Sequence, residues 1–127
     1  MLIHRADADA APFASRVLDG GEAVEIQAGL VAIPTPGHTP GHTMFLLDGE
    51  LLFSGDSLSW DPERNDLWAE KLVCWHSWPE QLTSLDRLAA HPFVRVIPSH
   101  GALSPVLPVH DMRERLRRLV AELRSSS

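Results

Sequence analysis

Three side chains that can bind a metal ion stand at turns far apart in the sequence. His38 lies in a loop rich in proline and glycine, Asp56 follows an apolar run and Gly55, and His100 follows another apolar run and Pro98-Ser99. Imidazole nitrogens and carboxylate oxygens are ligands of zinc and of similar divalent ions. Metal sites are usually assembled from such groups at the ends of rigid strands. His38, Asp56 and His100 are therefore candidate metal ligands, and we assign no further catalytic residue.

Each of the three also has an ordinary structural interpretation when it is taken alone. A histidine in a loop is more often not a ligand. An aspartate after a glycine commonly accepts a hydrogen bond from a backbone amide in a turn. A Ser-His-Gly sequence such as 99–101 often marks only the end of a strand. The case for a site therefore depends on whether the fold brings the three together.

A β-hairpin is expected to hold the first two candidates side by side. The apolar runs Met44–Leu47 and Leu51–Ser54 flank Asp48-Gly49. An Asp-Gly pair between apolar runs is a strong hairpin signal, because both central residues of such a turn need φ > 0. His38 precedes the first strand and Asp56 follows the second, so both should lie at the same end of the hairpin.

The remaining elements are predicted to form one α/β domain over residues 1–124. The expected strands are Met1–His4, Glu22–Gln27, Leu30–Ile33 and Val94–Ile97, and the expected loops are Arg5–Leu18 (with a helical turn), Ser57–Asn65 and Ala102–Pro108. The region Asp66–His76 is ambiguous. The order of strands, helix, strand and helix predicts a sheet covered by helices on one side. We expect the tail Ser125–Ser127 to be disordered.

Two helices follow from caps and periodicity. Ser77 and Glu80 form a capping box with Pro79 in the first turn, so that Ser77 accepts from the Glu80 amide while Glu80 reaches back. The helix that follows should end near His91-Pro92. The second predicted helix is His110–Arg124. The apolar faces consist of Trp78, Leu82, Leu85, Leu88 and Ala89 in the first helix, and of Met112, Leu116, Leu119, Val120 and Leu123 in the second.

Composition excludes several classes of partner. The net charge of −6 leaves no basic stripe to match nucleic-acid phosphates. The arginines of the last helix alternate with Glu114 and Glu122, and we interpret them as a solvated face. No apolar run approaches the roughly 18 residues of a membrane span. The only cysteine, Cys74, excludes an internal disulfide and favours a reducing compartment, so we expect a cytoplasmic protein.

Other reactive or aromatic side chains are weaker candidates. Cys74 and His76 are too close in sequence to face each other on a helix or strand, so a buried structural cysteine is favoured over a catalytic pair. His91, at a helix end, is interpreted as a favourable contact with the helix dipole. The four tryptophans, Trp60, Trp68, Trp75 and Trp78, are interpreted as core residues rather than as ligand contacts.

The order Pro-Gly-His-Thr, Phe-Ser-Gly-Asp and Ser-His-Gly resembles the metallo-β-lactamase superfamily of αββα-sandwich hydrolases. Within it, the chain is most similar to the glyoxalase II-like thioester hydrolases. The resemblance implies that His38 is a metal ligand, that Asp56 bridges two metal ions and that His100 binds the second ion. It leaves His42, at the start of the next strand, as a structural residue. Zinc is the expected metal, and iron or manganese is also compatible.

The chain departs from this family at its principal ligand motif, His-x-His-x-Asp-His. The segment His4–Asp9 matches it only at its first position. The chain therefore resembles the C-terminal half to two-thirds of such an enzyme, and we expect an incomplete sandwich. Two ligands remain for each of two ions. One ion held by all three residues, two ions completed by another chain, and no bound metal are all open interpretations.

Two functional hypotheses follow. In the first, the chain is a metallo-β-lactamase-like hydrolase, weak or inactive as an isolated chain. Metal-bound hydroxide would attack a small thioester or ester, and a lactam or a phosphoester is left open as substrate. In the second, it is a non-catalytic domain that forms a homodimer or binds a separate N-terminal segment, because missing strands would leave sheet edges exposed. A shortened gene product, with the ligand motif encoded upstream, is a third interpretation.

Overall fold

A five-stranded sheet forms the centre of the fold in the computed structural model, which describes residues 2–4, 16–18 and 23–126. Its strands, in spatial order, are β3 (Val24–Gln27), β4 (Leu30–Pro34), β5 (Thr43–Leu47), β6 (Leu51–Gly55) and β9 (Arg95–Pro98). Neighbours are antiparallel except β6 and β9, which are parallel. Two small sheets pair β1 (Leu2–His4) with β2 (Arg16–Leu18), and β7 (Ser59–Asp61) with β8 (Asp66–Trp68).

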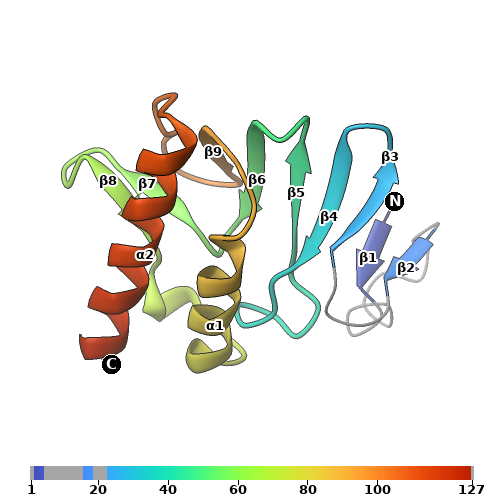
Figure 1. The fold of residues 1–127 in the computed structure, drawn as a ribbon. Coiled ribbons are helices and arrows are strands. Elements are labelled where there is room, and N and C mark those ends of the chain that lie inside the picture. The colour runs from blue at the N-terminus through green and yellow to red at the C-terminus, as the bar shows by residue number, and fades with distance from the viewer. Residues whose placement is uncertain (1, 5–15, 19–22, 127) are drawn as a thin grey trace.

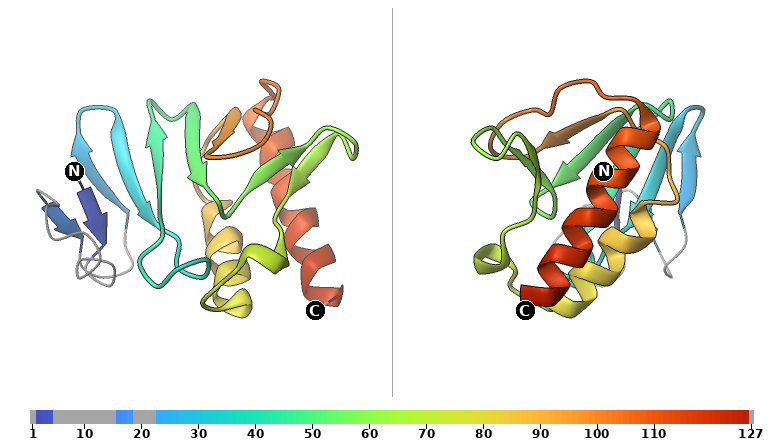
Figure 2. Two further views of the ribbon diagram at one scale, coloured as in Figure 1. Left: turned by 180° about the vertical axis from the view of Figure 1, so that it is seen from behind. Right: turned by 60° about the vertical axis from the view of Figure 1, so that its left-hand side comes forward.

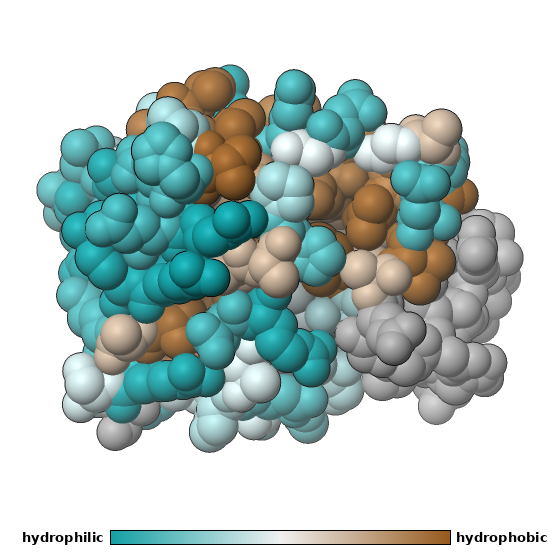
Figure 3. Space-filling view, in the orientation of Figure 1, coloured by the Kyte–Doolittle hydropathy of each residue, from teal (hydrophilic) through white to brown (hydrophobic). Residues whose placement is uncertain are grey.

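Helices α1 (Trp78–Leu88) and α2 (Val109–Ser126) lie on the same side of this sheet, as the sequence predicts (Figures 1 and 2). All ten apolar positions predicted for their inner faces are buried. They pack on Met44, Leu46, Leu52 and Val96 of the sheet. Figure 3 shows mainly hydrophilic residues over the two helices and hydrophobic residues over the neighbouring strands. No helix in the described ranges is long and apolar enough to cross a membrane.

The predicted hairpin is confirmed in detail. Asp48 and Gly49 have φ of +55° and +65°, as the tight turn between β5 and β6 requires. Because β4 and β6 both run antiparallel to β5, and β9 runs parallel to β6, these three strands end at the same edge of the sheet. This edge receives the loops that carry His38, Asp56 and His100.

The start of α1 differs from a complete capping box. Ser77 Oγ accepts from the Glu80 amide at 3.2 Å, as predicted. The Glu80 carboxylate does not reach back, because it pairs with His76 Nε2 at 3.1 Å. The Ser77 amide donates instead to the Gly37 carbonyl at 2.8 Å. The helix end is thereby attached to the loop that carries His38.

A further hairpin, β7–β8, occupies a region predicted as loop and as ambiguous. β7 lies within 57–65, and its partner β8 begins at Asp66. Trp60 and Leu67 are paired across the two strands and are both buried in the core. The three-residue strands are too short to give a clear alternation in the sequence.

Two further expectations at the chain ends are wrong. Arg16–Leu18 forms a strand instead of part of a loop, whereas residues 5–15 lie outside the described residues. Ser125 and Ser126 continue α2, and both hydroxyls donate to the Glu122 carbonyl at 3.1 Å. Ser127 is outside the described residues.

The basic residues of α2 are only partly a solvated face. Arg115 contacts both Asp66 and Asp111, and the hydrogen bond to Asp66 is the main cause of its raised pKa. Arg113 Nε donates to the Ala89 carbonyl at 2.7 Å. Burial lowers the pKa of His91.

The face of the sheet opposite the helices carries a row of apolar residues. Ala32, Phe45, Phe53 and Ile97 are successive cross-strand partners on β4, β5, β6 and β9. The Phe53 side chain, at 39% exposure, is one of the exposed large hydrophobic residues of the described chain. Neither α1 nor α2 lies on this face (Figure 2, left).

Candidate metal centre

The three predicted ligands meet around the carboxylate of Asp56. His38 Nε2 lies 3.5 Å from Asp56 Oδ2, and His100 Nδ1 lies 3.1 Å from Asp56 Oδ1. Each imidazole therefore approaches a different oxygen of the same carboxylate. The convergence of three strand ends explains why residues so distant in sequence are neighbours.

The three side chains differ in how firmly they are enclosed. His38 is buried, with 8% of its surface exposed. The side chains of Asp56 and His100 are 39% and 87% exposed. They line one cleft of about 460 Å³, together with Gly55, Ser59, Glu70, Val73 and Trp75. A buried candidate ligand and two accessible ones thus face a space that admits a small molecule.

The loop before β5 is fixed in place by α1 and by the segment that precedes it. The Gly37 carbonyl accepts from the Ser77 amide and from the Cys74 thiol, and the His38 carbonyl accepts from the Trp75 amide at 3.2 Å. Gly37 has φ of +146°, and a Cβ there would lie 2.3 Å from the Cα of Gln81. Only glycine allows this close approach, which holds His38 at the cleft.

His42 contacts residues next to the candidate ligands, which fits the structural role expected for it. Its Nδ1 lies 3.0 Å from Thr35 Oγ1 and 3.2 Å from Ser57 Oγ. Gly55, with φ of +61°, allows its Nε2 to approach, because a Cβ there would lie 2.6 Å away. The ring joins the loop of His38 to the chain just after Asp56.

The donor set fits part of a metal centre. Two imidazoles flank one carboxylate, which is the arrangement expected of a bridging aspartate with one histidine on each side. Among the described residues, no group of three or more His, Cys, Asp or Glu side chains is placed to hold one ion. Each of two ions would thus have two ligands from these side chains, Asp56 itself and one histidine, fewer than the three or four of typical zinc sites.

The structure settles the surroundings of the other candidate residues. Cys74 is half-buried, and its thiol donates to the Gly37 carbonyl at 3.2 Å. Trp60 and Trp78 are core residues, and Trp68 packs partly against the core. Trp75 is not a core residue, contrary to expectation, because 81% of its surface is exposed. The sequence did not identify Ser59, Glu70, Val73 or Trp75 as cleft residues, since no local pattern distinguishes them.

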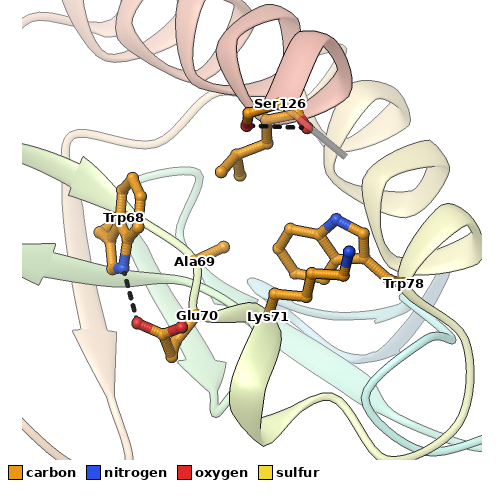
Figure 4. A pocket seen from close by; sticks show the side chains of 7 residues that line it. Trp68, Ala69, Glu70, Lys71, Trp78 and Ser126 are labelled. Atoms are coloured by element: carbon orange, nitrogen blue, oxygen red, sulfur yellow. Dashed lines mark hydrogen bonds between the residues drawn. The ribbon is translucent and has the colours of Figure 1, made fainter.

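A second, smaller cavity lies beside the cleft (Figure 4). Its volume is about 170 Å³, and it lies between β8, η2 (Lys71–Val73) and the two helices. Glu70 lines both spaces, and its carboxylate accepts from Trp68 Nε1 at 3.3 Å. None of the three candidate ligands lines this cavity.

Solved structures with a similar fold are known. A metallo-beta-lactamase family protein from Thermus thermophilus, TTHA1429, aligns with a TM-score of 0.55 and 30% identity over 87% of this chain and 35% of its own. TTHA1623 in a di-iron-bound form aligns with a TM-score of 0.58 and 26% identity over 91% of this chain and 62% of its own. The metallo-beta-lactamase FIM-1 from Pseudomonas aeruginosa, in its mono-zinc form, aligns with a TM-score of 0.61 and 18% identity over 96% of this chain and 55% of its own. This similarity shows likeness of fold alone.

The chain spans between 35% and 62% of the length of these three proteins. No protein-family profile matches this chain, and neither does any curated protein sequence. The mixed α/β fold, with its sheet and two helices, corresponds to part of the fold of the relatives. On this evidence, the chain has the fold of part of a metallo-β-lactamase superfamily protein and is similar to members of that superfamily in sequence.

Proposed function

We propose that the chain contributes part of the ligand set of a metal-dependent hydrolase centre. Asp56 would bridge two divalent ions, with His38 on one side and His100 on the other. The observation that carries this proposal is the approach of two separate imidazoles to the two oxygens of one carboxylate, at 3.5 and 3.1 Å. Relatives solved with zinc or with two irons support a divalent metal.

His38, Asp56 and the adjoining cleft would have different roles in such a centre. Bound divalent ions would supply Lewis-acid chemistry and activate water. His38, fixed by its loop, sets one ligand in place before any ion arrives. The Asp56 carboxylate supplies the negative charge that makes two nearby cations tolerable. The open cleft beside them receives the substrate, which we propose is a small thioester or ester, as in glyoxalase II-like hydrolases.

The chain by itself should hydrolyse such substrates weakly or not at all. Each ion would have two ligands from the described side chains, the shared Asp56 and one histidine, whereas catalytic zinc sites typically use three. We propose that the further ligands come from polypeptide outside the described side chains.

Zinc content tests the proposal. After dialysis against zinc and then against buffer, the protein should retain about one or two equivalents by elemental analysis. Asp56→Ala should lose this zinc, because Asp56 belongs to both sides of the site. His110→Gln, which alters an exposed histidine that does not line the cleft, is the control and should retain it. Equal zinc in all three proteins would contradict the proposal.

A second candidate function is assembly through the sheet face on which neither α1 nor α2 lies (Figure 2, left). The row of Phe45, Phe53 and Ile97 leaves apolar surface without a helix on it. Two sheets pack face to face about 10 Å apart through such rows. A second copy of the chain can supply an identical row about a two-fold axis. We therefore propose a homodimer as the occupant of this face.

Sedimentation over a wide concentration range tests this assembly. The protein should shift from monomer to dimer as its concentration rises, and Phe53→Asp should weaken the dimer by about 30-fold or more, as loss of a central apolar contact does. Val106→Asp is the matched control, because Val106 is exposed and lies outside the sheet. A monomer at every concentration, or equal effects of the two substitutions, would exclude the homodimer.

A further inference from the structure

Exposed apolar residues are concentrated beside the candidate metal centre. Leu72, Val73 and Trp75 are 88%, 41% and 81% exposed, and they lie close together in the chain, in and just after η2. Val73 and Trp75 line the cleft that contains the candidate ligands, whereas Leu72 does not. Burial in the core cannot explain these side chains. Apolar surface gathered at a cleft commonly marks a binding site.

The segment that carries Trp75 is held rigidly against the site. The Trp75 amide donates to the His38 carbonyl, and the Cys74 amide donates to the Lys71 carbonyl at 3.0 Å. The Glu70 carboxylate caps η2 by accepting from the Leu72 amide. A segment fixed in this way loses little conformational entropy when a ligand binds.

The Trp75 ring stands next to a candidate ligand. Its centroid lies 5.6 Å from that of the His38 ring, at an interplanar angle of 30°. With 81% of the residue exposed, most of the indole surface is available to a ligand in the cleft. A group bound on this surface would place its polar end toward Asp56.

We infer that Trp75 and Val73 form an apolar recognition surface for the acyl or aryl part of the substrate. Resting on the function proposed above, this inference adds that the site prefers carbonyl compounds with an extended apolar group over acetyl compounds. Trp75 is then a specificity-determining residue, and Leu72, on the same segment, is not.

Indole N–H signals in ¹⁵N-correlated NMR spectra test this inference on metal-free protein. The chain has four tryptophans, and the signal lost in Trp75→Phe identifies that of Trp75. Hexanamide and acetamide are suitable probes, since they are neutral and differ only in the length of their apolar chains. The Trp75 signal should shift on titration, and hexanamide should bind roughly tenfold more tightly than acetamide, because methylene groups gain affinity when buried.

Matched variants distinguish specific binding at Trp75 and Val73 from nonspecific binding to exposed apolar side chains. Trp75→Ala should bring the two affinities close together, Val73→Ala should reduce the difference, and Leu72→Ala should leave it unchanged. A Trp75 signal that does not shift on titration would overturn the inference. Equal effects of Trp75→Ala and Leu72→Ala on the difference between the two affinities would also overturn it. Zinc binding with a silent Trp75 would leave the metal centre intact and reject this surface, whereas a Trp75 response without zinc binding would reject the metal centre alone.

Discussion

Replacing Gly37 with alanine should destabilise the protein by about 3 kcal/mol or more, from strain and overpacking together. The added Cβ would lie 2.3–2.4 Å from the Cα, Cβ and backbone nitrogen of Gln81. Because Gln81 is in α1, neither side can yield without separating the loop from the helix. The same movement would displace His38 and break the hydrogen bond from the Ser77 amide. Denaturant unfolding followed by circular dichroism measures the loss.

Gly101→Ala is the matched control for this prediction. Gly101 also has a positive φ, of +91°, but an added Cβ there meets nothing within 4 Å. It should therefore cost only the conformational strain, about 1–2 kcal/mol. If both substitutions cost the same, the close approach of Gly37 to α1 would not be what fixes the loop.

His38→Ala should weaken zinc binding about fivefold more than His100→Ala. His38 is 8% exposed and lies between the rings of His42 and Trp75, so its imidazole is already in place before an ion binds. The His100 side chain is 87% exposed and must lose more rotational freedom on binding. That difference in ordering corresponds to roughly 1 kcal/mol for one side chain. Competition with a zinc-binding dye measures both affinities.

The His38 comparison requires that the variant stays folded. His38 Nδ1 is buried and has no hydrogen-bond partner among the described residues, so its removal leaves no partner there unsatisfied. Far-ultraviolet circular dichroism of the two variants should therefore match that of the unaltered protein. Equal zinc affinities in the two folded variants would show that the enclosure of His38 contributes nothing to binding.

The parts of the fold that the sequence predicts are those with strong local signals. The Asp48-Gly49 turn, the Ser77 cap and the helical spacing of the buried leucines each require a specific backbone geometry. The meeting of His38 with Asp56 follows from the hairpin. Their meeting with His100 depends on β9 pairing parallel to β6, which the order of elements permits but does not determine.

Features fixed by tertiary contacts could not be predicted in this way. Trp60 and Trp75 have similar surroundings in the sequence, yet one is buried in the core and the other is exposed at the cleft. The Ser77 amide is expected from the sequence to donate to the Glu80 carboxylate. It donates instead to the carbonyl of Gly37, far away in the sequence, and the Glu80 carboxylate pairs with His76. The pKa of His91 is lowered because neighbouring chain covers it, which no local pattern reveals.

The most direct test of the metal centre is anomalous diffraction at the zinc edge from crystals soaked in zinc. We predict anomalous density beside the Asp56 carboxylate, on the side of His38, on the side of His100, or on both, at about 2 Å from the ligand atoms. Zinc bound only at exposed histidines such as His76 or His110, with none at Asp56, would contradict the assignment of these three residues as metal ligands.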